Sequence, residues 1–468
     1  MAKTSRLVLS SNVRICKIEQ NRKFRAYLQK NADFWACLSF PVHIRTVPCE
    51  NHGYVDLLHI LNISWQVKGV TGTVDSLMID NLYLGDTSEI KVIRVEDLGV
   101  PKAAVIPTVV PLASIAITNP MQTLAEKLDH GINTDSWLEE AAPFTGFRYS
   151  EPDVKNWAAK GFKALRLPID LDQYVVDKAG YLAGTAAFAV KDSLFVVLDS
   201  FELWTARYGM SFTIDYHEYD KGFDATTSKN PVYVSMMTQL WKHVAEHFAS
   251  NTRDDIFYEL FNEPDNAVGA ATWGSVAQSM IDSIRTMDTS HAVIFGDVNW
   301  YGVASLVNRT PLNDSKVIYA IHYYEPFIFS HQGTSWTDAN SLHGIPFPYD
   351  SASWPTSSSD LGVTASTVGY IKSQIINYYK TGNKETQKIQ IQRAKQWAVT
   401  HNVPLILNEF GAYGPVADNA SRLRFYRAIT EICQELEIPW QHWGITDPFS
   451  VLDSNGELLP GMKDALQL

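Results

Sequence analysis

Short apolar runs alternate with longer amphipathic segments from about residue 120 to the end of the chain. The apolar runs, bounded by polar or turn residues, predict buried strands, and the amphipathic segments predict helices. The predicted strands are residues 128–133, 162–168, 210–217, 255–263, 292–295, 317–323, 405–409 and 440–443. The predicted helices are residues 193–207, 234–248, 272–287, 387–400 and 422–436, with shorter segments at 157–160 and 462–468. Eight strands alternating with helices predict an α/β fold, a (β/α)8 TIM barrel over residues 119–468.

Residues 1–100 carry a different pattern, with strand-like runs at 34–40, 57–65 and 74–84 separated by glycine-containing turns. We therefore expect a small β-sandwich, jelly-roll-like, ahead of the barrel. The order of these features resembles the closing strands of jelly-roll carbohydrate-binding modules. A truncated module of that kind and a packing domain without a ligand are both compatible with the pattern.

Two further stretches show no helix or strand pattern and are expected to be connections. Residues 101–118 hold Pro101, Pro107 and Pro111, which exclude a helix interior, so we expect an extended linker that packs along a surface. Residues 325–366, after the sixth predicted strand, are rich in Ser, Pro, Trp and Gly. Connections of this length are uncommon unless they serve function, so we expect this one to shape a site at its end of the barrel.

Seven of the eight predicted strands end in side chains suited to catalysis or binding. The carboxyl ends of parallel strands meet on one face of a barrel, so these side chains are expected to converge there. A single buried Arg or His is usually a satisfied structural residue, but a set drawn from seven strands predicts one site. The set is Asn133, Arg166, His217, Asn262 with Glu263, His322 with Tyr324, Glu409, and Trp443.

Glycoside hydrolysis is the chemistry that uses such a set. It needs one carboxyl that is protonated, to donate to the leaving oxygen, and one that is ionised, to attack or to activate water. The two Asn-Glu pairs supply these carboxyls. Neutral sugar rings are bound by Trp and Tyr faces and by hydrogen bonds from Asn and His. An Arg beside the nucleophile favours the ionised form of that carboxylate.

Six motifs in this order resemble glycoside hydrolase family 5, the cellulase family of clan A. They are Arg166-Leu167-Pro168, Asp215-Tyr216-His217, Asn262-Glu263-Pro264, His322-Tyr323-Tyr324, Asn408-Glu409-Phe410-Gly411 and Trp443. The resemblance implies a retaining mechanism with Glu263 as acid/base and Glu409 as nucleophile. With these roles we expect a raised pKa for Glu263 and a lowered one for Glu409 beside Arg166. It also implies a supporting shell of Arg166, His217, Asn262, His322, Tyr324 and Trp443, the last under the sugar in subsite −1. One departure is Asn408, because many members have Gly before the nucleophile.

Two flanking segments extend the resemblance. Residues 324–336, which include Trp336, resemble a loop of bacterial endoglucanases in this family, and this favours β-1,4-glucan over mannan. Trp336 and Trp354 can extend a sugar platform or staple the loop down. Asn133 lies in a segment that resembles the family's first-strand motif, and we expect both Asn133 and Trp336 to bind substrate. The role of Asn299-Trp300, after the fifth strand, stays open.

Composition narrows the partners. The formal charge of −12 argues against nucleic acid and anionic membranes, whereas a neutral polymer feels no such repulsion. No segment reads as a membrane span or a signal peptide, although a cellulase is expected to be secreted. Cys16, Cys37, Cys49 and Cys433 have no metal-ligand spacing, and one disulfide among the first three is possible. We therefore expect a β-glucan substrate and neither a cofactor nor a metal. The oligomeric state stays open.

The sequence is compatible with three classes of function. An endo-β-1,4-glucanase is favoured. An exo-acting β-glucanase, a mannanase or a xyloglucanase on the same barrel differs only in the loops around the cleft. A non-catalytic polysaccharide-binding protein is disfavoured because both Glu263 and Glu409 are present.

Overall fold

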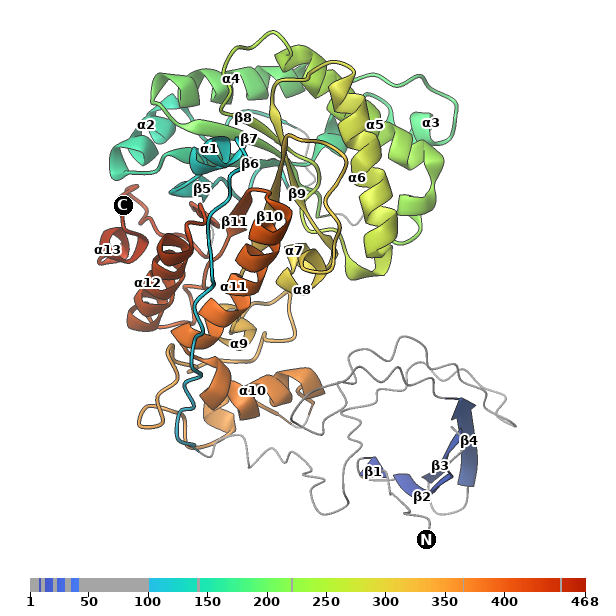
Figure 1. The fold of residues 1–468 in the computed structure, drawn as a ribbon, viewed down its shortest axis with the longest axis vertical. Coiled ribbons are helices and arrows are strands. Elements are labelled where there is room, and N and C mark those ends of the chain that lie inside the picture. Colours follow the sequence, from blue (N-terminus) through green and yellow to red (C-terminus); the bar gives the residue numbers. More distant parts are fainter. Residues whose placement is uncertain are drawn as a thin grey trace. The chain divides into compact units, whose positions relative to one another are not determined.

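The computed structural model describes residues 101–140, 144–219, 222–364, 366–446 and 448–468, together with the backbone of four N-terminal strands (Figure 1). The chain divides into two compact units. One is formed by Pro101–Thr356, Asp360–Gly362 and Asn377–Leu468, and the other by Met1–Val100, Ser357–Ser359 and Val363–Ile376. All the residues predicted to form the site belong to the first unit.

A parallel sheet of eight strands forms the centre of this unit, in the order β11-β10-β9-β8-β7-β6-β5-β12. A parallel bridge between Leu407 and Trp440 brings β11 next to the start of β12, so the sheet is nearly closed into a barrel. This confirms the predicted TIM-barrel-like fold. The strands are β5 (Gly131–Asn133), β6 (Ala164–Ile169), β7 (Ser211–Tyr216), β8 (Ile256–Glu259), β9 (Ala292–Gly296), β10 (Val317–His322), β11 (Leu405–Glu409) and β12 (Gln441–His442).

Helices surround the sheet (Figure 1). The main ones are α2 (Glu151–Lys160), α4 (Ser193–Arg207), α5 (Pro231–Phe248), α6 (Ala270–Arg285), α11 (Lys384–His401) and α12 (Asn419–Leu436). Shorter helices are α1 (Gln122–Glu126), α3 (Lys178–Leu182), α7 (Val298–Tyr301), α8 (Val303–Leu306), α9 (Phe327–Ser330) and α13 (Met462–Leu466). Helix α10 (Gly369–Thr381) was not predicted.

Local signals in the sequence set the helix ends. Helix α2 begins with a reciprocal capping box between Ser150 and Asp153 and ends at Gly161, whose φ of 110° suits a residue without a Cβ. Asn230 caps α5 by accepting a hydrogen bond from the Val232 N–H. These caps fix where each helix starts and stops, and so where each following strand enters the barrel.

Helix α1 fills the amino-terminal end of the barrel. Met121 and Ala125 are buried in one hydrophobic cluster with Phe257, Ile318 and Ile406 from three strands. This leaves the opposite end, where the strands finish, for polar side chains. The first predicted strand began too early, because Leu128 belongs to this apolar plug and β5 starts at Gly131.

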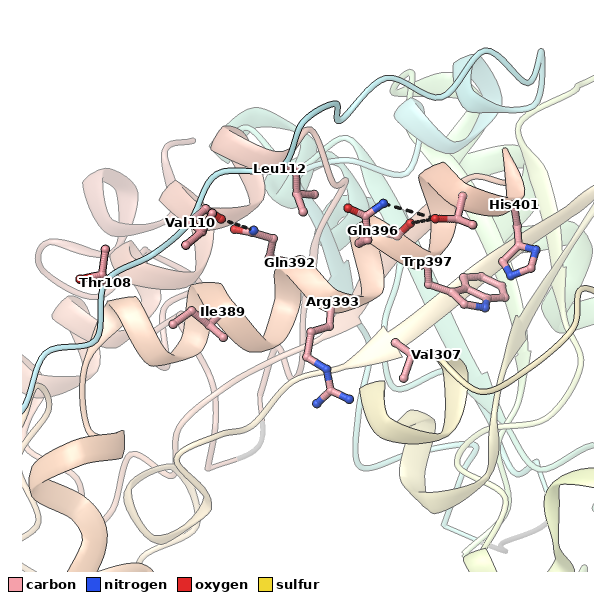
Figure 2. A pocket seen from close by; sticks show the side chains of 11 residues that line it. Thr108, Val110, Leu112, Val307, Ile389, Gln392, Arg393, Gln396, Trp397 and His401 are labelled. Atoms are coloured by element: carbon pink, nitrogen blue, oxygen red, sulfur yellow. Dashed lines mark hydrogen bonds between the residues drawn. The ribbon is translucent and has the colours of Figure 1, made fainter. Parts of the chain in front are cut away.

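The stretch 101–118 contains neither helix nor strand and runs along α11 (Figure 2). The Gln392 side chain donates to the Val110 carbonyl at 2.6 Å. A groove of about 620 Å³ lies between this stretch, α8 and α11, lined by residues such as Leu112, Val307 and Trp397. None of its lining residues belongs to the predicted site.

In the N-terminal region the structure describes β1 (Val8–Leu9), β2 (Val13–Glu19), β3 (Lys23–Gln29) and β4 (Trp35–Pro41). They form one antiparallel sheet in sequence order. The predicted strand 34–40 coincides with β4, but the predicted strands 57–65 and 74–84 lie outside the described residues. The β-sandwich therefore stays a prediction. No helix in the described part of the chain is long and apolar enough to cross a membrane.

Candidate active site

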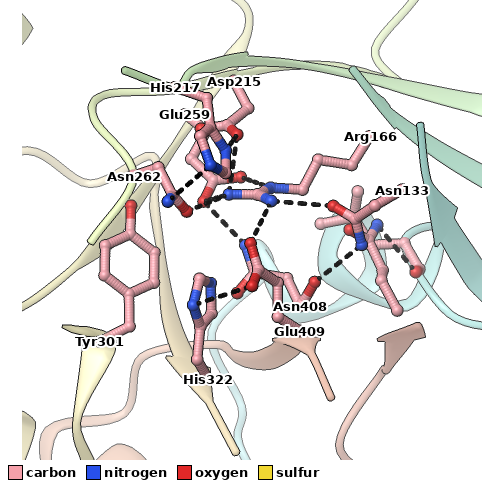
Figure 3. A network of polar contacts seen from close by, with 12 residues as sticks. Asn133, Arg166, Asp215, His217, Glu259, Asn262, Tyr301, His322, Asn408 and Glu409 are labelled. Atoms are coloured by element: carbon pink, nitrogen blue, oxygen red, sulfur yellow. Dashed lines mark hydrogen bonds and ion pairs between the residues drawn. The ribbon is translucent and has the colours of Figure 1, made fainter. Parts of the chain in front are cut away.

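The polar strand ends converge at the carboxyl end of the barrel (Figure 3). Asn133 ends β5, Arg166 lies in β6, His217 follows β7, His322 ends β10 and Glu409 ends β11. Asn262 and Glu263 follow β8, Tyr324 follows β10 and Trp443 follows β12. Because the strands are parallel neighbours in one sheet, side chains far apart in the sequence share one small volume.

Arg166 is the centre of the network. It is fully buried, and its Nε and Nη2 donate to the two carboxylate oxygens of Glu259 at 2.7 and 2.9 Å. Nη1 donates to Asn133 Oδ1 at 2.8 Å and to Glu409 Oε1 at 2.6 Å. Nη2 also reaches Asn262 Oδ1 at 2.8 Å and Asp215 Oδ2 at 2.9 Å. Because all three nitrogens of the guanidinium have partners, its orientation is fixed, and it fixes the orientation of the side chains that it binds.

Glu409 receives hydrogen bonds on both carboxylate oxygens. Arg166 donates to Oε1, and the Tyr324 hydroxyl donates to Oε2 at 2.9 Å. His322 Nδ1 lies 3.4 Å from the same Oε2. The side chain is 5% exposed. Hydrogen bonds of this kind favour the ionised carboxylate and fix its orientation.

Glu263 faces Glu409 across His322. His322 Nδ1 lies 2.6 Å from Glu263 Oε1. One oxygen of each carboxyl group and a His322 nitrogen all lie within 4.8 Å of one another. Glu263 is more open than Glu409, with 28% of its side chain exposed, and its φ of 47° lies in the left-handed region that non-glycine residues avoid. Such backbone is found where a fold fixes a functional side chain.

His217 and Asn262 form a chain of hydrogen bonds beside Arg166. His217 Nδ1 lies 2.8 Å from Asp215 Oδ2, and Asn262 Nδ2 lies 3.0 Å from His217 Nε2. A neutral ring that donates from Nδ1 and accepts at Nε2 satisfies both contacts. The His217 ring stacks on Trp443, with centroids 5.4 Å apart and an interplanar angle of 25°. The tryptophan is therefore held against the polar network.

Burial sets the protonation of these groups. It raises the pKa of Glu263 to about 7, against smaller opposing effects from His217 and Arg166. This confirms the expected direction. Burial also raises the pKa of Glu409, and it outweighs His322 and Arg166, which act to lower it. The expected lowering of the Glu409 pKa was therefore wrong, because the fold removes this carboxyl group from water and that cost exceeds the effect of the Arg166 charge. The buried rings of His217 and His322 have pKa values lowered to about 4, so both are neutral near pH 7.

Four members of the network were not predicted from the sequence to be site residues. Glu259 holds Arg166, Asp215 holds Arg166 and His217, and Asn408 Nδ2 donates to Glu259 Oε1 at 2.8 Å. The fourth, Tyr301, is fully buried against His322, with ring centroids 4.5 Å apart. Only Glu259 could have been predicted from the sequence, because it is a charged residue inside the apolar strand β8.

The aromatic residues of the long loop take different places. Trp336 is 61% exposed and packs edge-on against Tyr413, whereas Trp354 is 4% exposed and stacks on Tyr378. Trp354 is therefore a staple of the loop. Trp336 lies beside the network, linked to it through the Phe449 ring, which is 6.1 Å from the Tyr324 ring. Trp300 is 54% exposed and outside the hydrogen-bonded set.

Two acidic residues outside the network, Asp297 and Asp453, have partners in the fold. Asp297 pairs with Arg309 and caps α7, and Asp453 accepts two backbone hydrogen bonds within a turn. Asp447 lies outside the described residues. Among those that are described, Glu263, His322 and Glu409 are the one group whose ligand atoms are close enough for a metal ion. Within this group Glu409 is held by Arg166 and Tyr324, and Glu263 is held by His322. Cys433 is a buried free thiol, and the structure does not describe the other cysteine side chains.

A family model described as cellulase, glycosyl hydrolase family 5, matches residues 131–447. The chain belongs to glycosyl hydrolase family 5. Endoglucanase 3 of Fibrobacter succinogenes is 51% identical to it over 421 residues, which are 88% of this chain and 64% of that protein. Endoglucanase C of Acetivibrio thermocellus is 22% identical over 67% of this chain and 90% of its own length.

Solved structures show the same family fold. Endoglucanase Cel5A from Thermotoga maritima superposes with a TM-score of 0.61 at 20% identity, over 74% of this chain and 99% of that one. This similarity supports the barrel and no more. The family match, by contrast, spans every residue of the strand-end network, from Asn133 to Trp443.

Proposed function

We propose that the chain is a retaining endo-β-1,4-glucanase that cleaves cellulose or related β-glucans. The observation that carries the proposal is the pair Glu263 and Glu409, which have carboxylate oxygens within 4.8 Å of each other and of His322. Retaining glycosidases hold their two carboxyl groups ~5–5.5 Å apart, and inverting ones ~6.5–9.5 Å. An upper bound of 4.8 Å between the nearest oxygens of the two groups falls on the retaining side of these ranges.

In the first step Glu409 attacks the anomeric carbon and Glu263 protonates the departing glycosidic oxygen. The C1–O bond breaks as the bond from Glu409 to C1 forms, and the leaving chain takes the Glu263 proton. In the second step the ionised Glu263 removes a proton from water, which attacks C1 and releases Glu409. The environments support these roles, because Arg166 and Tyr324 hold Glu409 while burial raises the pKa of Glu263 to about 7.

The supporting shell has distinct tasks in this proposal. Arg166 and Tyr324 balance the charge of Glu409 and orient it. Asn262, held by Arg166 and His217, hydrogen-bonds the sugar hydroxyl next to C1. Trp443, stacked on His217, presents its face to the ring in subsite −1. Asn133 acts indirectly, since its side chain is fully buried and bonded to Arg166 and two carbonyls. In this proposal the exposed Trp336 binds a sugar unit beyond subsite −1.

The relatives favour glucan and endo action. The protein of 51% identity is named an endoglucanase, as is the T. maritima structure. This chain spans 64% of the former, so substrate and mode of action stay proposals. A β-glucan polymer stays outside cells, so the enzyme is expected to act there. In this scheme residues 1–100 form a carbohydrate-binding-module-like domain, 101–118 a linker and 119–468 the catalytic domain.

Product analysis on carboxymethylcellulose, mannan and a soluble cello-oligosaccharide tests the proposal, with Glu409→Gln compared to wild type. A fast fall in carboxymethylcellulose viscosity that is absent in the variant is expected. Glucose or cellobiose released without loss of viscosity would mean exo action, and activity on mannan alone would change the substrate. Proton NMR of the first-formed products distinguishes retention from inversion. Appreciable turnover by Glu409→Gln would refute its role as nucleophile.

A further inference from the structure

The turn after β9 has an unusual backbone. Asn299, Trp300 and Tyr301 follow one another in the left-handed region, with φ values of 64°, 55° and 55°. One such non-glycine residue is uncommon, and three in a row are unfavourable for L-residues. Asp297 anchors the turn by accepting from the Val298 N–H and by pairing with Arg309. A backbone of this kind persists when the surrounding structure requires it.

The turn directs Tyr301 into the barrel. The side chain is fully buried, whereas the preceding Trp300 is 54% exposed. The Tyr301 ring lies against Gly296, where a Cβ atom would meet it at 2.1 Å. Glycine at this last position of β9 is therefore needed to seat the ring. Burial and the nearby carboxylates of Glu259 and Asp215 raise the pKa of Tyr301, so its hydroxyl stays protonated and donates.

Tyr301 touches both supports of Glu263. Its hydroxyl donates to the Phe261 carbonyl at 2.7 Å, two residues before Glu263. Its ring packs on His322, with centroids 4.5 Å apart, and His322 Nδ1 lies 2.6 Å from Glu263 Oε1. One side chain thus fixes the backbone that leads into the left-handed Glu263 and the imidazole that holds its carboxyl group.

We propose that Tyr301 is a positioning residue for the proton donor Glu263, acting through the Phe261 carbonyl and the His322 ring. The inference rests on the proposed function, in which Glu263 protonates the departing oxygen. Among the described residues Tyr301 donates no hydrogen bond to Arg166 or Glu409, although its hydroxyl also interacts with the Glu259 carboxylate that holds Arg166. Glu259 keeps its two hydrogen bonds to Arg166 without this contact, so loss of the Tyr301 hydroxyl should impair proton donation much more than nucleophilic attack.

Leaving-group dependence separates these two effects. A cello-oligosaccharide leaves as an alkoxide unless it is protonated, whereas 2,4-dinitrophenolate leaves without a proton. Misplacing a general acid costs up to about 10²-fold in rate. For Tyr301→Phe we expect kcat/KM on cellotetraose to fall about 10-fold or more, and kcat/KM on 2,4-dinitrophenyl β-cellobioside to change by less than about 2-fold. The ratio of the two rates does not depend on the fraction of folded enzyme.

Two further variants make the test specific. Gly296→Ala displaces the ring without removing the hydroxyl and should shift the ratio in the same direction. Tyr258→Phe removes a different buried hydroxyl on β8, one that donates to Asp288 at 2.7 Å, and should leave the ratio unchanged. Glu263→Ala gives the ratio for complete loss of the acid.

The outcomes distinguish the inference from the proposed function. Equal losses on both substrates for Tyr301→Phe, or no loss on either, would overturn the inference while a selective Glu263→Ala upholds the mechanism. A Glu263→Ala variant without selectivity for the dinitrophenyl substrate, or an inactive wild type, would overturn the proposed function itself. A selective loss shared by Tyr301→Phe and Gly296→Ala, and absent in Tyr258→Phe, is the result expected here.

Discussion

Arg166 and Glu259 show how a single buried pair can organise a site. The guanidinium is bound by Glu259 through two hydrogen bonds, and this leaves Nη1 pointing at Glu409 and Asn133. Asn408, next to the nucleophile, donates to the same Glu259 carboxylate. The departure from Gly-Glu at this position therefore has a structural role, because the extra amide ties β11 to β8.

Replacing Glu259 by Gln should damage both stability and activity. The change keeps the shape but puts an amide N–H against an arginine N–H in a fully buried place. Breaking a buried ion pair on one side costs about 3–5 kcal/mol, and a shifted Arg166 should lower kcat about 10²-fold. Urea unfolding and steady-state kinetics measure the two effects. The exposed Glu246→Gln is the matched control and should change stability by less than about 0.5 kcal/mol. A Glu259→Gln variant as stable as this control would contradict the argument.

The pH profile should have a basic limb set by Glu263. Its pKa is raised to about 7, and the group acts while protonated, so kcat/KM on a cello-oligosaccharide should fall as pH rises through about 7. Glu409 acts while ionised and its pKa is also raised, so the acidic limb should lie above the ordinary glutamate value of 4.5. His217 and His322, with pKa values lowered to about 4, cannot produce the basic limb.

The same profile measured with 2,4-dinitrophenyl β-cellobioside serves as the control for the basic limb. Because this substrate needs no proton donor, the fall above pH 7 should weaken or vanish for the step that forms the glycosyl-enzyme. An unchanged basic limb on both substrates would mean that a group other than Glu263 controls it.

At the level of elements, two helices end in the same way with different residues. Asn402 closes α11 and Glu437 closes α12, both left-handed, with φ of 50° and 51°. Asn402 Oδ1 also accepts from the backbone N–H groups of Thr118 and Asn119 at 2.8 and 3.1 Å, whereas the Glu437 side chain is exposed. The first cap therefore joins α11 to the start of the barrel, and the second only ends a helix.

Glycine at the two caps should have opposite effects. Glu437→Gly relieves the left-handed strain and should raise the free energy of unfolding by about 0.5–1 kcal/mol. Asn402→Gly relieves a smaller strain but removes the three hydrogen bonds that Asn402 Oδ1 accepts from Thr118 and Asn119, and should lower the free energy of unfolding by about 1 kcal/mol. Thermal and denaturant unfolding of both variants measure the difference. Equal effects would mean that the Asn402 contacts with residues 118 and 119 contribute nothing to stability.

The sequence allowed the barrel to be predicted because its strands are short apolar runs with polar ends. Each of the eight appears in the structure, and α4 has the bounds expected for it. The errors fall where local pattern and tertiary contact differ. Leu128 looks like part of a strand and instead fills the barrel end with α1, and α10 has only a weakly apolar pattern.

The site could be predicted only as far as its residues stand at strand ends or in familiar motifs. Glu259 and Tyr301 act through contacts with groups that are distant in the sequence, Arg166 and His322. Their roles depend on how two neighbouring strands and a left-handed turn lie in space, which no spacing along the chain reveals. The prediction of a lowered pKa for Glu409 was wrong for a related reason, since the burial of this carboxyl group follows from the completed fold.

At the scale of the whole molecule, catalysis and the N-terminal region belong to separate units. The described residues of the network all lie within Pro101–Thr356 and Asn377–Leu468. Catalysis on a small soluble substrate should therefore depend on the barrel alone. Turnover of an insoluble polymer also depends on how long the enzyme stays on the surface, and a second sugar-binding domain raises the local concentration of enzyme there.

Deleting residues 1–100 should separate these two contributions. We expect kcat/KM on cellotetraose to stay within about 2-fold of the full chain, because the deletion leaves Arg166, Glu263 and Glu409 in place. Adsorption to insoluble cellulose should fall if the N-terminal region binds glycan, and a pull-down with Glu409→Gln in both lengths of chain measures binding without turnover. Unchanged adsorption would make the region a packing domain. A collapse of the soluble activity, in a truncated chain that still unfolds cooperatively, would instead mean that the first hundred residues hold the barrel in its active form.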